Sequence, residues 1–456
     1  MPGYPSASQI GCLKRRCILA ESDIDMQSAR DRLEIILSRL ANRAADEKVY
    51  VKLYTQAALA AADAADARQR AGVCLGPLDG VVVSIKDLFD VAGEPTRAGS
   101  RMLAGAQPAA QDAAIVRRLR QAGAVILGKT NMTEFAFTAI GDNLHYGTSG
   151  NAADASLIPG GSSSGAGVAV GEGSSQVSIG SDTGGSVRIP ASLNGVVGFK
   201  PTARRVPLDG AFPLSATLDS IGPLARSVGD CAVADAIMAG EEPMALQPIP
   251  LAGLRIGVPR GRLFDDTQAD VAAAFEACTS QMERAGARVA DLSIDDLIGG
   301  MRAATMRASI ASMEGAEVHA DWLATGASVP VDPHVSGPLS RALTVPASAY
   351  IRTIRRRAEL VAAMAERLQA VDALALPTVP MVAPSIAAMA GDEALRDRTE
   401  GLLLRNTQVA NQFDLCAISL PMPGTKLPAG LMLVARHGHD RRLLGFAAAV
   451  EALLSG

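Results

Sequence analysis

The residues that could do chemistry gather in a segment rich in glycine and serine, residues 159–200. This segment holds eleven glycines and nine serines, a composition that is typical of a flexible linker. Short apolar runs around Val177, Ile179 and Phe199 argue against a linker, because a linker has no apolar surface to bury. Glycine permits tight turns and close approach of the backbone to another group. The segment is therefore the leading candidate for a reactive site.

Two serines in this segment, Ser162 and Ser186, each follow a pair of glycines and stand 24 residues apart. Consecutive glycines allow backbone N–H groups to crowd around a reacting oxygen, as an oxyanion hole requires. A serine that attacks a carbonyl group also needs a base to take its proton. The pattern predicts covalent catalysis by serine, provided that a base is available.

Lysine is the better candidate for that base, because residues 146–318 contain no histidine. Lys86 follows the apolar run VVVSI at residues 81–85. Burial lowers the pKa of a lysine and can supply a neutral amine near pH 7. The structural alternative is that Lys86 forms an ion pair with Asp87 or Asp90 at the end of a strand.

Two other motifs overlap the same segment. Residues 161–165 read G-S-S-S-G and match the nucleophile elbow G-x-S-x-G, which would make Ser163 the nucleophile and require a histidine such as His437 or His439 as its base. Residues 165–171 approach the dinucleotide fingerprint G-x-G-x-x-G but carry one residue too many before the last glycine. We regard both as weaker interpretations than a site containing two serines.

The elements that must position these residues alternate between strand and helix. Residues 25–70 are expected to be helical, and 78–87 form a buried strand. A helix over 113–122 precedes a strand over 124–127, and the strand at 254–260 precedes a helix over about 266–286. This alternation predicts a layered α/β fold with a largely buried sheet.

Bulk composition excludes several classes of protein. The 456 residues are 48% hydrophobic and 20% charged, with a net charge of −4 and no basic tract, so we expect neither a nucleic-acid nor a membrane partner. The six scattered cysteines predict reduced thiols in a cytoplasmic protein. The start of the chain does not have the order of a signal peptide. The apolar stretch 373–391 contains three prolines, which predicts a buried strand followed by a loop rather than a membrane span.

Several ordered motifs together resemble the amidase signature family. They are PGGSSSGAGVAVGEGSSQVSIGSDTGGSVRIPASLNGVVGFKPT at residues 159–202, GPLDGVVVSIKDLFDVAG at 76–93, AGAVILGKTNMTEFAF at 122–137, and RNTQVANQFDLCAISLP with LPAGLMLVA near the C-terminus. The resemblance runs from about residue 25 to the end. It implies a layered α/β/α fold with a large mixed central β-sheet flanked by helices. It also implies one catalytic domain over 25–456 with a helical part at 25–75, preceded by an extension over 1–24 of uncertain order.

The resemblance assigns a role to each candidate residue. It implies that Ser186 is the nucleophile that becomes acylated and that Lys86 is the base. Ser162 would relay the proton between them, held by a cis peptide bond after Gly161.

Other residues near these positions also have expected places. Phe137 is expected in the core, with the alternative that Phe137 or its neighbour Thr138 lines the acyl pocket, while Ser163, Asp182 and Arg188 are expected to be structural residues near the site. The histidines are expected on the surface or in loops, without a metal-binding set. The backbone N–H groups implied to form the oxyanion hole are those of Thr183, Gly184, Gly185 and Ser186.

The expected function is hydrolysis of a small carboxamide to an acid and ammonia or an amine. One alternative is a glutaminase-type subunit of an amidotransferase complex, and another is a binding protein without catalytic activity, since fold alone does not prove activity. We expect no cofactor and no metal. The expected partner is the small amide substrate, with a homodimer as one possible assembly.

Overall fold

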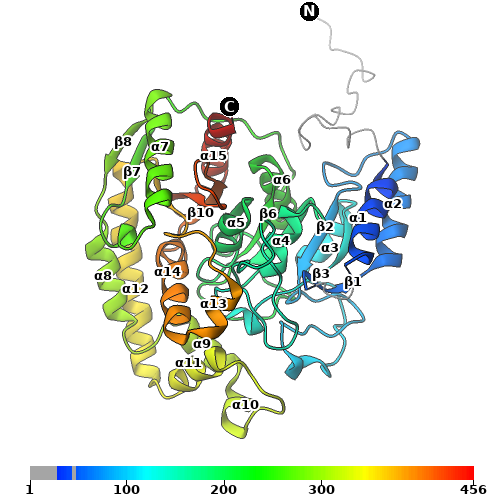
Figure 1. The fold of residues 1–456 in the computed structure, drawn as a ribbon, viewed down its shortest axis with the longest axis horizontal. Coiled ribbons are helices and arrows are strands. Elements are labelled where there is room, and N and C mark those ends of the chain that lie inside the picture. The colour runs from blue at the N-terminus through cyan, green and yellow to red at the C-terminus, as the bar shows by residue number, and fades with distance from the viewer. Residues whose placement is uncertain (1–27, 44–47, 456) are drawn as a thin grey trace, which may run out of the picture.

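The computed structural model describes residues 28–43 and 48–455, so the expected extension over 1–24 lies outside the described residues. Within them, eleven strands form one mixed sheet in the order β1-β3-β2-β4-β6-β5-β10-β11-β9-β7-β8. Figure 1 shows this sheet running from β8 on the left to β1 on the right. The strands are β1 Tyr50–Leu53, β2 Val82–Lys86, β3 Val125–Thr130, β4 Val177–Ser181, β5 Val197–Lys200, β6 Ile221–Ala225, β7 Arg255–Val258, β8 Arg288–Asp291, β9 Ala373–Pro377, β10 Cys416–Pro421 and β11 Gly430–Ala435.

Fifteen α-helices of the described residues connect and cover these strands. They are α1 Ala29–Ala41, α2 Thr55–Arg70, α3 Ala114–Gln121, α4 Ser164–Gly171, α5 Arg188–Asn194, α6 Val228–Ala239, α7 Ala269–Arg284, α8 Asp295–Ala304, α9 Ile310–Val318, α10 Ala320–Thr325, α11 Pro333–Leu343, α12 Ala347–Arg367, α13 Ile386–Gly391, α14 Glu393–Gln412 and α15 Asp440–Ser455.

The sheet is buried on both faces, because alternate side chains of its strands enter different hydrophobic cores. In β2, Val83 and Ile85 join the core that includes α3, α6, α7 and α15, whereas Val82 faces the core of α1, α2 and α4. In β9, Leu374 enters a third core with α8, α12 and α14. A strand that packs on both faces reads as a continuous apolar run, which is how β2 reads. The α/β/α layers and the mixed sheet expected from the sequence are confirmed.

The alternation in β2 also decides where Lys86 points. Its side chain lies on the same face as those of Val82 and Ser84, because residues two and four positions apart share one face of a strand. That face is covered by α4, which begins directly after the serines at 162 and 163. Strand β4 pairs in parallel with β2 and leads into the loop that carries Ser186. The central strands and two short helices thus bring the candidate residues to one edge of the sheet.

Three expectations about local structure were wrong. Residues 25–70 are not continuously helical, because β1 lies between α1 and α2 and pairs antiparallel with the edge of β3. Strand β3 continues past the expected end at 127 to Thr130, stabilised by pairing on both sides. The stretch 373–391 ends in helix α13 rather than in a loop, with Ser385 capping its first turn. His319, expected on the surface or in a loop, lies in the turn between α9 and α10, where its side chain is buried.

The cysteines and the helices bear on the expected thiols and on the expected lack of a membrane span. Cys74, Cys231, Cys278 and Cys416 are free thiols, and the other two cysteines lie outside the described residues. Among the helices described, none combines the length and the apolar character that crossing a bilayer demands.

Candidate active site

Lys86, at the end of β2, is fully buried and contacts two serine hydroxyls. Its Nζ lies 2.8 Å from Ser162 Oγ and 2.8 Å from Ser181 Oγ. Burial lowers the pKa of Lys86 to about 7, and the negative charges of Asp219 and Asp182 oppose this shift. A substantial fraction of the amine is therefore neutral near pH 7 and can accept a proton.

Ser162 is fixed by the backbone on both of its sides. The peptide bond between Gly161 and Ser162 is cis. The Gly161 N–H donates to the Ala139 carbonyl at 2.6 Å, and the Ser162 carbonyl accepts from the Thr133 N–H at 3.1 Å. The Ser162 side chain is fully buried. These contacts leave the hydroxyl aimed at Lys86 with little freedom to move.

Ser186 follows the tight loop between β4 and α5 and lies beside the Ser162 segment. Its carbonyl accepts a hydrogen bond from the Ser163 N–H at 3.2 Å. Its hydroxyl makes no hydrogen bond with any residue that the structure describes, and the residue borders a cavity. The structure therefore brings Lys86 and Ser162 into direct contact, with Ser186 adjacent and open to an incoming molecule.

The loop that ends at Ser186 presents four consecutive backbone N–H groups, those of residues 183–186. Within residues 28–43 and 48–455, the backbone N–H groups of residues 183–186 find no acceptor. Three residues of this loop, Thr183, Gly184 and Ser186, line the cavity. Buried N–H groups are almost always paired, so a run of unpaired donors beside a cavity is a site ready to bind an oxygen atom.

Side chains from distant parts of the chain hold this loop. Thr183 Oγ1 donates to Asp219 Oδ1 at 2.5 Å, and Thr407 Oγ1 donates to the Gly184 carbonyl at 2.7 Å. Gly185 has φ of +139°, and a Cβ there would lie 2.2 Å from Thr407 Oγ1. Glycine is therefore required at 185, both for the backbone conformation and for the close approach of α14.

A buried ion pair lies directly beneath the loop. Arg188 Nη2 is 2.8 Å from Asp182 Oδ1, and the same guanidinium donates to the Thr407 carbonyl and to Asn411 Oδ1. Burial by itself would raise the pKa of Asp182, but the charge and hydrogen bonds of Arg188 hold it below its ordinary value. The pair connects the start of α5 to α14 across the site.

The two competing motifs have different surroundings. The Ser163 hydroxyl is buried and donates to the Ser181 carbonyl at 3.2 Å, rather than to a histidine. Of the two histidines considered as its base, His437 is largely exposed and pairs with Asp414. Residues 165–171 form helix α4, which is buried in the protein, and not a phosphate-binding loop.

A cavity of about 510 Å³ opens beside Ser186. Near Ser186 its wall is largely apolar, and Phe137 and Thr138 both belong to it. Helix α14 supplies one side, with Leu404 close to Gly184 and Glu400 one turn further out. The apolar residues in the wall are Ala136, Phe137, Ala139, Leu214, Leu218, Ile310, Ala311, Pro333, Pro338 and Leu404.

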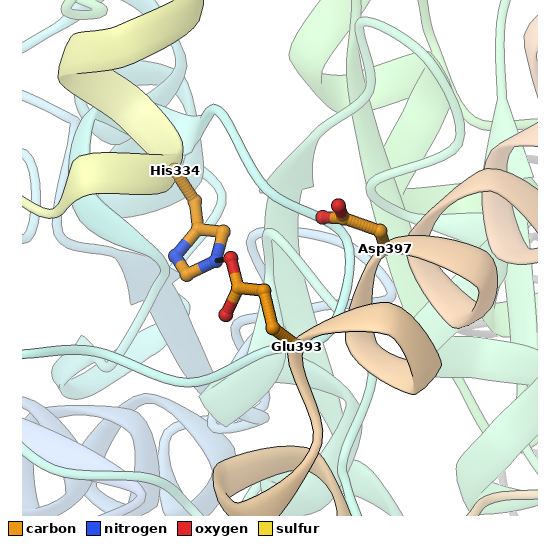
Figure 2. Close-up of side chains that lie close together, drawn as sticks. All are labelled: His334, Glu393 and Asp397. Carbon is orange, nitrogen blue, oxygen red and sulfur yellow. Dashed lines mark hydrogen bonds and ion pairs between the residues drawn. The ribbon is translucent and has the colours of Figure 1, made fainter.

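Charged side chains surround the outer part of the cavity, and three of them meet between α11 and α14 (Figure 2). The ligand atoms of His334, Glu393 and Asp397 all lie within 4.8 Å of one another, a set of one nitrogen and two oxygens that could accept a divalent cation. His334 Nδ1 is 2.9 Å from Asp332 Oδ1, and its Nε2 is 2.9 Å from Glu393 Oε1. Burial by itself would lower the pKa of His334, but these hydrogen bonds hold it above its ordinary value. His334 forms ion pairs with Asp332 and Glu393 in this arrangement.

Four residues that contact this site were not recognised in the sequence. Ser181 ends the buried strand β4, and Asp219 lies just before the buried strand β6. In the sequence, the only sign of either residue was a polar side chain next to an apolar run. Thr407 and Glu400 lie on α14, more than 200 residues from the serines. Their place in the helix does not distinguish them from residues that face solvent.

The comparisons with known proteins identify the family of this chain. The amidase family model matches residues 31–444, and the chain belongs to the amidase family, whose members are hydrolases that carry the amidase signature. A 2-amino-5-chloromuconic acid deaminase of Comamonas testosteroni is 36% identical, with 87% of this chain and 86% of the relative covered. A glutamyl-tRNA(Gln) amidotransferase subunit of Anaeromyxobacter dehalogenans (strain 2CP-C) is 34% identical, with 93% and 92% covered. A crystal structure of an amidase superposes with a TM-score of 0.84 at 34% identity, covering 94% of this chain and 97% of that one.

Proposed function

We propose that this chain is an amidase that hydrolyses a small carboxamide through an acyl-enzyme on Ser186. The observation that carries the proposal is the buried amine of Lys86, 2.8 Å from Ser162 Oγ, beside a cavity that exposes Ser186 and a row of unpaired N–H groups. A base, a relay and a nucleophile next to an anion-binding loop are the parts that acyl transfer requires.

In the acylation step, neutral Lys86 accepts a proton from Ser162 as Ser162 accepts one from Ser186. The Ser186 oxygen attacks the amide carbonyl carbon, and the carbonyl oxygen becomes an oxyanion. The backbone N–H groups of Thr183, Gly184, Gly185 and Ser186 donate hydrogen bonds to that oxygen. Donors that are already oriented and unpaired stabilise the charge without reorganisation, a contribution of about 3–4 kcal/mol for one well-placed donor.

In the second half of the reaction the relay runs in the opposite direction. Protonated Lys86 returns a proton through Ser162 to the amide nitrogen, so the C–N bond breaks and ammonia or an amine leaves. A water molecule then gives its proton to the same relay and attacks the acyl carbon. The acid departs, and Ser186 regains its hydrogen. Asp219 assists by holding the loop through Thr183, 2.5 Å away.

The cavity supports a small substrate. Its volume of about 510 Å³ lies in the range of sites for small molecules. An apolar wall next to Ser186 suits a hydrocarbon acyl portion, with Phe137 and Thr138 beside it. The charged outer part suits a polar or ionised group at the far end of the substrate.

The decisive experiment is labelling with a fluorophosphonate probe, followed by mass spectrometry of the labelled peptide. We expect one equivalent on Ser186 in the folded wild type and none in Ser186→Ala or Lys86→Ala. A panel of aliphatic, aryl and peptide amides, tested on the same three proteins, then identifies the amide that is cleaved.

Ser192→Ala is a matched control on α5, the helix that follows Ser186, because the Ser192 hydroxyl is buried and has no hydrogen-bond partner in the described chain. It should be labelled at the wild-type rate. Labelling on Ser163 would support the nucleophile elbow. An unreactive wild type would support a binding protein on this fold, and full activity in Lys86→Ala would overturn the triad.

A second candidate is the ammonia-producing subunit of an amidotransferase. The similarity to a glutamyl-tRNA(Gln) amidotransferase subunit over 93% of this chain favours it. Vigorous amide hydrolysis by the isolated chain supports the stand-alone amidase. Glutamine hydrolysis that appears only with a co-purified partner and a tRNA-binding subunit supports the second candidate.

A further inference from the structure

We propose that Glu400 of α14 is a positioning residue that holds Ser162 in place through the backbone of residues 139 and 140. This inference rests on the proposed function, because it assigns Glu400 a role in the reactivity of the same site. Glu400 does not touch the triad, and nothing in its sequence context distinguishes it.

The connection consists of two consecutive layers of hydrogen bonds. The Ala139 N–H donates to Glu400 at 2.7 Å from Oε1 and 3.0 Å from Oε2. On the other side of this segment, the Ala139 carbonyl accepts from the Gly161 N–H at 2.6 Å, and the Ile140 carbonyl accepts from the Gly160 N–H at 3.1 Å. Gly161 is the residue that precedes Ser162. The carboxylate is therefore two hydrogen bonds from the peptide that carries the relay serine.

The two segments around Gly141 and Gly161 are packed too tightly to absorb a displacement. A Cβ on Gly141 would lie 2.6 Å from the Gly160 carbonyl oxygen, and a Cβ on Gly161 would lie 2.9 Å from Thr133 Cγ2. Segments that leave no space for a methyl group between them have little room for independent movement. A shift of residues 139 and 140 should therefore be passed on to Ser162.

Helix α14 is itself well placed to act as the anchor. One turn before Glu400, Arg396 Nη1 forms an ion pair with Asp142 Oδ2 at 2.5 Å. One turn after it, Leu404 Cδ2 would lie 3.2 Å from a Cβ on Gly184. The helix thus contacts the segment that supports Ser162 and the loop that precedes Ser186. Glu400 supplies the middle contact of this set.

The protonation state of Glu400 decides how many N–H groups it can hold. Burial raises the pKa of Glu400 to about 7. The N–H groups of Ala139 and Ile140 and the charge of Arg396 oppose this shift, whereas the negative charge of Asp142 adds to it. An ionised carboxylate accepts at both oxygens, whereas the acid form replaces one acceptor by a donor. The other charged residues in the wall of the same cavity are His334, Arg341, Glu393 and Asp397.

The test is the rate of fluorophosphonate labelling at Ser186 in wild type, Glu400→Gln and Glu451→Gln, measured across pH 5.5–9. The Gln side chain has the same shape but cannot accept at both ends. We expect the limiting rate of Glu400→Gln at high pH to fall by about tenfold or more, because small displacements of reacting groups have effects of this size. The Glu451 variant is the matched control, since Glu451 on α15 is also a half-buried carboxylate that accepts a backbone N–H, from Val228 at 2.9 Å, but it does not line the cavity.

The pH profile separates positioning from a general loss of stability. In the wild type the rate rises as Lys86 and Glu400 each lose a proton, so log rate against pH should have a slope clearly above one just below pH 7. Glu400→Gln should show a slope of about one with a lower plateau. Glu400→Asp, which keeps the charge, should retain the steeper slope and serves as the second variant if Gln does not fold.

Each other outcome overturns the inference. Equal limiting rates in wild type and Glu400→Gln would show that the carboxylate does not position Ser162, while the proposed function stands. A wild-type slope of one, or an equal loss of rate in Glu451→Gln, would remove the role of Glu400 in the same way. An unreactive wild-type Ser186 would overturn the proposed function and this inference together.

Discussion

Replacing Lys86 by Met should abolish labelling of Ser186 and at the same time make the protein more stable. Lys86 is fully buried, with its pKa lowered from 10.5 to about 7. The unfolded chain therefore binds a proton that the folded protein partly gives up, and this difference destabilises the fold. Methionine has a similar length and carries no charge, so the variant escapes this cost.

The size of the effect follows from the two pKa values. The cost of burying Lys86 is about 4 kcal/mol at pH 7 and about 2 kcal/mol at pH 9, and it vanishes above pH 10.5. The variant also loses the hydrogen bonds to Ser162 and Ser181, and each loss destabilises it by about 1 kcal/mol. The variant should be more stable than wild type by about 2 kcal/mol at pH 7, and this advantage should shrink by about 2 kcal/mol at pH 9.

The assay is chemical denaturation of both proteins at several pH values between 6 and 10. The pH dependence of the difference is the sharper readout, because the lost contacts contribute equally at every pH. Lys52→Met is a control, since Lys52 Nζ is 2.6 Å from Glu94 and its side chain is 41% exposed. A difference in stability that does not change with pH would show that folded Lys86 remains charged, and a charged amine cannot be the base.

Three further outcomes are expected. Ser162→Ala should lower the labelling rate of Ser186 by about 10²–10⁴-fold, the usual loss when proton transfer fails, with the folded structure intact by circular dichroism; an unchanged rate would remove the relay. Amide hydrolysis by the wild type should rise with pH around pH 7, because Lys86, whose pKa is about 7, must be neutral; a rate that falls over this range would contradict the proposal. Asp182→Asn should destabilise the protein by about 3–5 kcal/mol in denaturant titrations, because it leaves Arg188 buried without its counter-charge; a loss below about 1 kcal/mol would show that the pair is dispensable.

Part of this protein could be predicted from the sequence because it depends on local composition. The apolar run before Lys86 indicates a strand that is buried on both faces, and burial alone accounts for a lowered lysine pKa. The glycines before Ser186 indicate a tight loop. The order of the motifs was enough to recognise the family, and with it the layered fold and its mixed sheet.

Errors arose where neighbours in space override local preference. The short strand β1 sits between two helices and exists because β3 offers an unpaired edge. His319 lies in a turn, as the sequence allows, but its burial depends on Phe135, which packs against its ring at a centroid distance of 4.2 Å. Such choices depend on the partner available rather than on the residue itself.

The identity of the contacts at the site was decided by the tertiary structure. The pairing of β2 with β4 brings Ser181 to Lys86, and the pairing of β4 with β6 brings Asp219 to Thr183. Glu400 reaches Ala139 from 261 residues away. A sequence pattern records the periodicity of one element but not which element packs against it. The sequence by itself therefore determined the reaction class and the candidate nucleophile, whereas packing decided how the base, the relay and the loop are held.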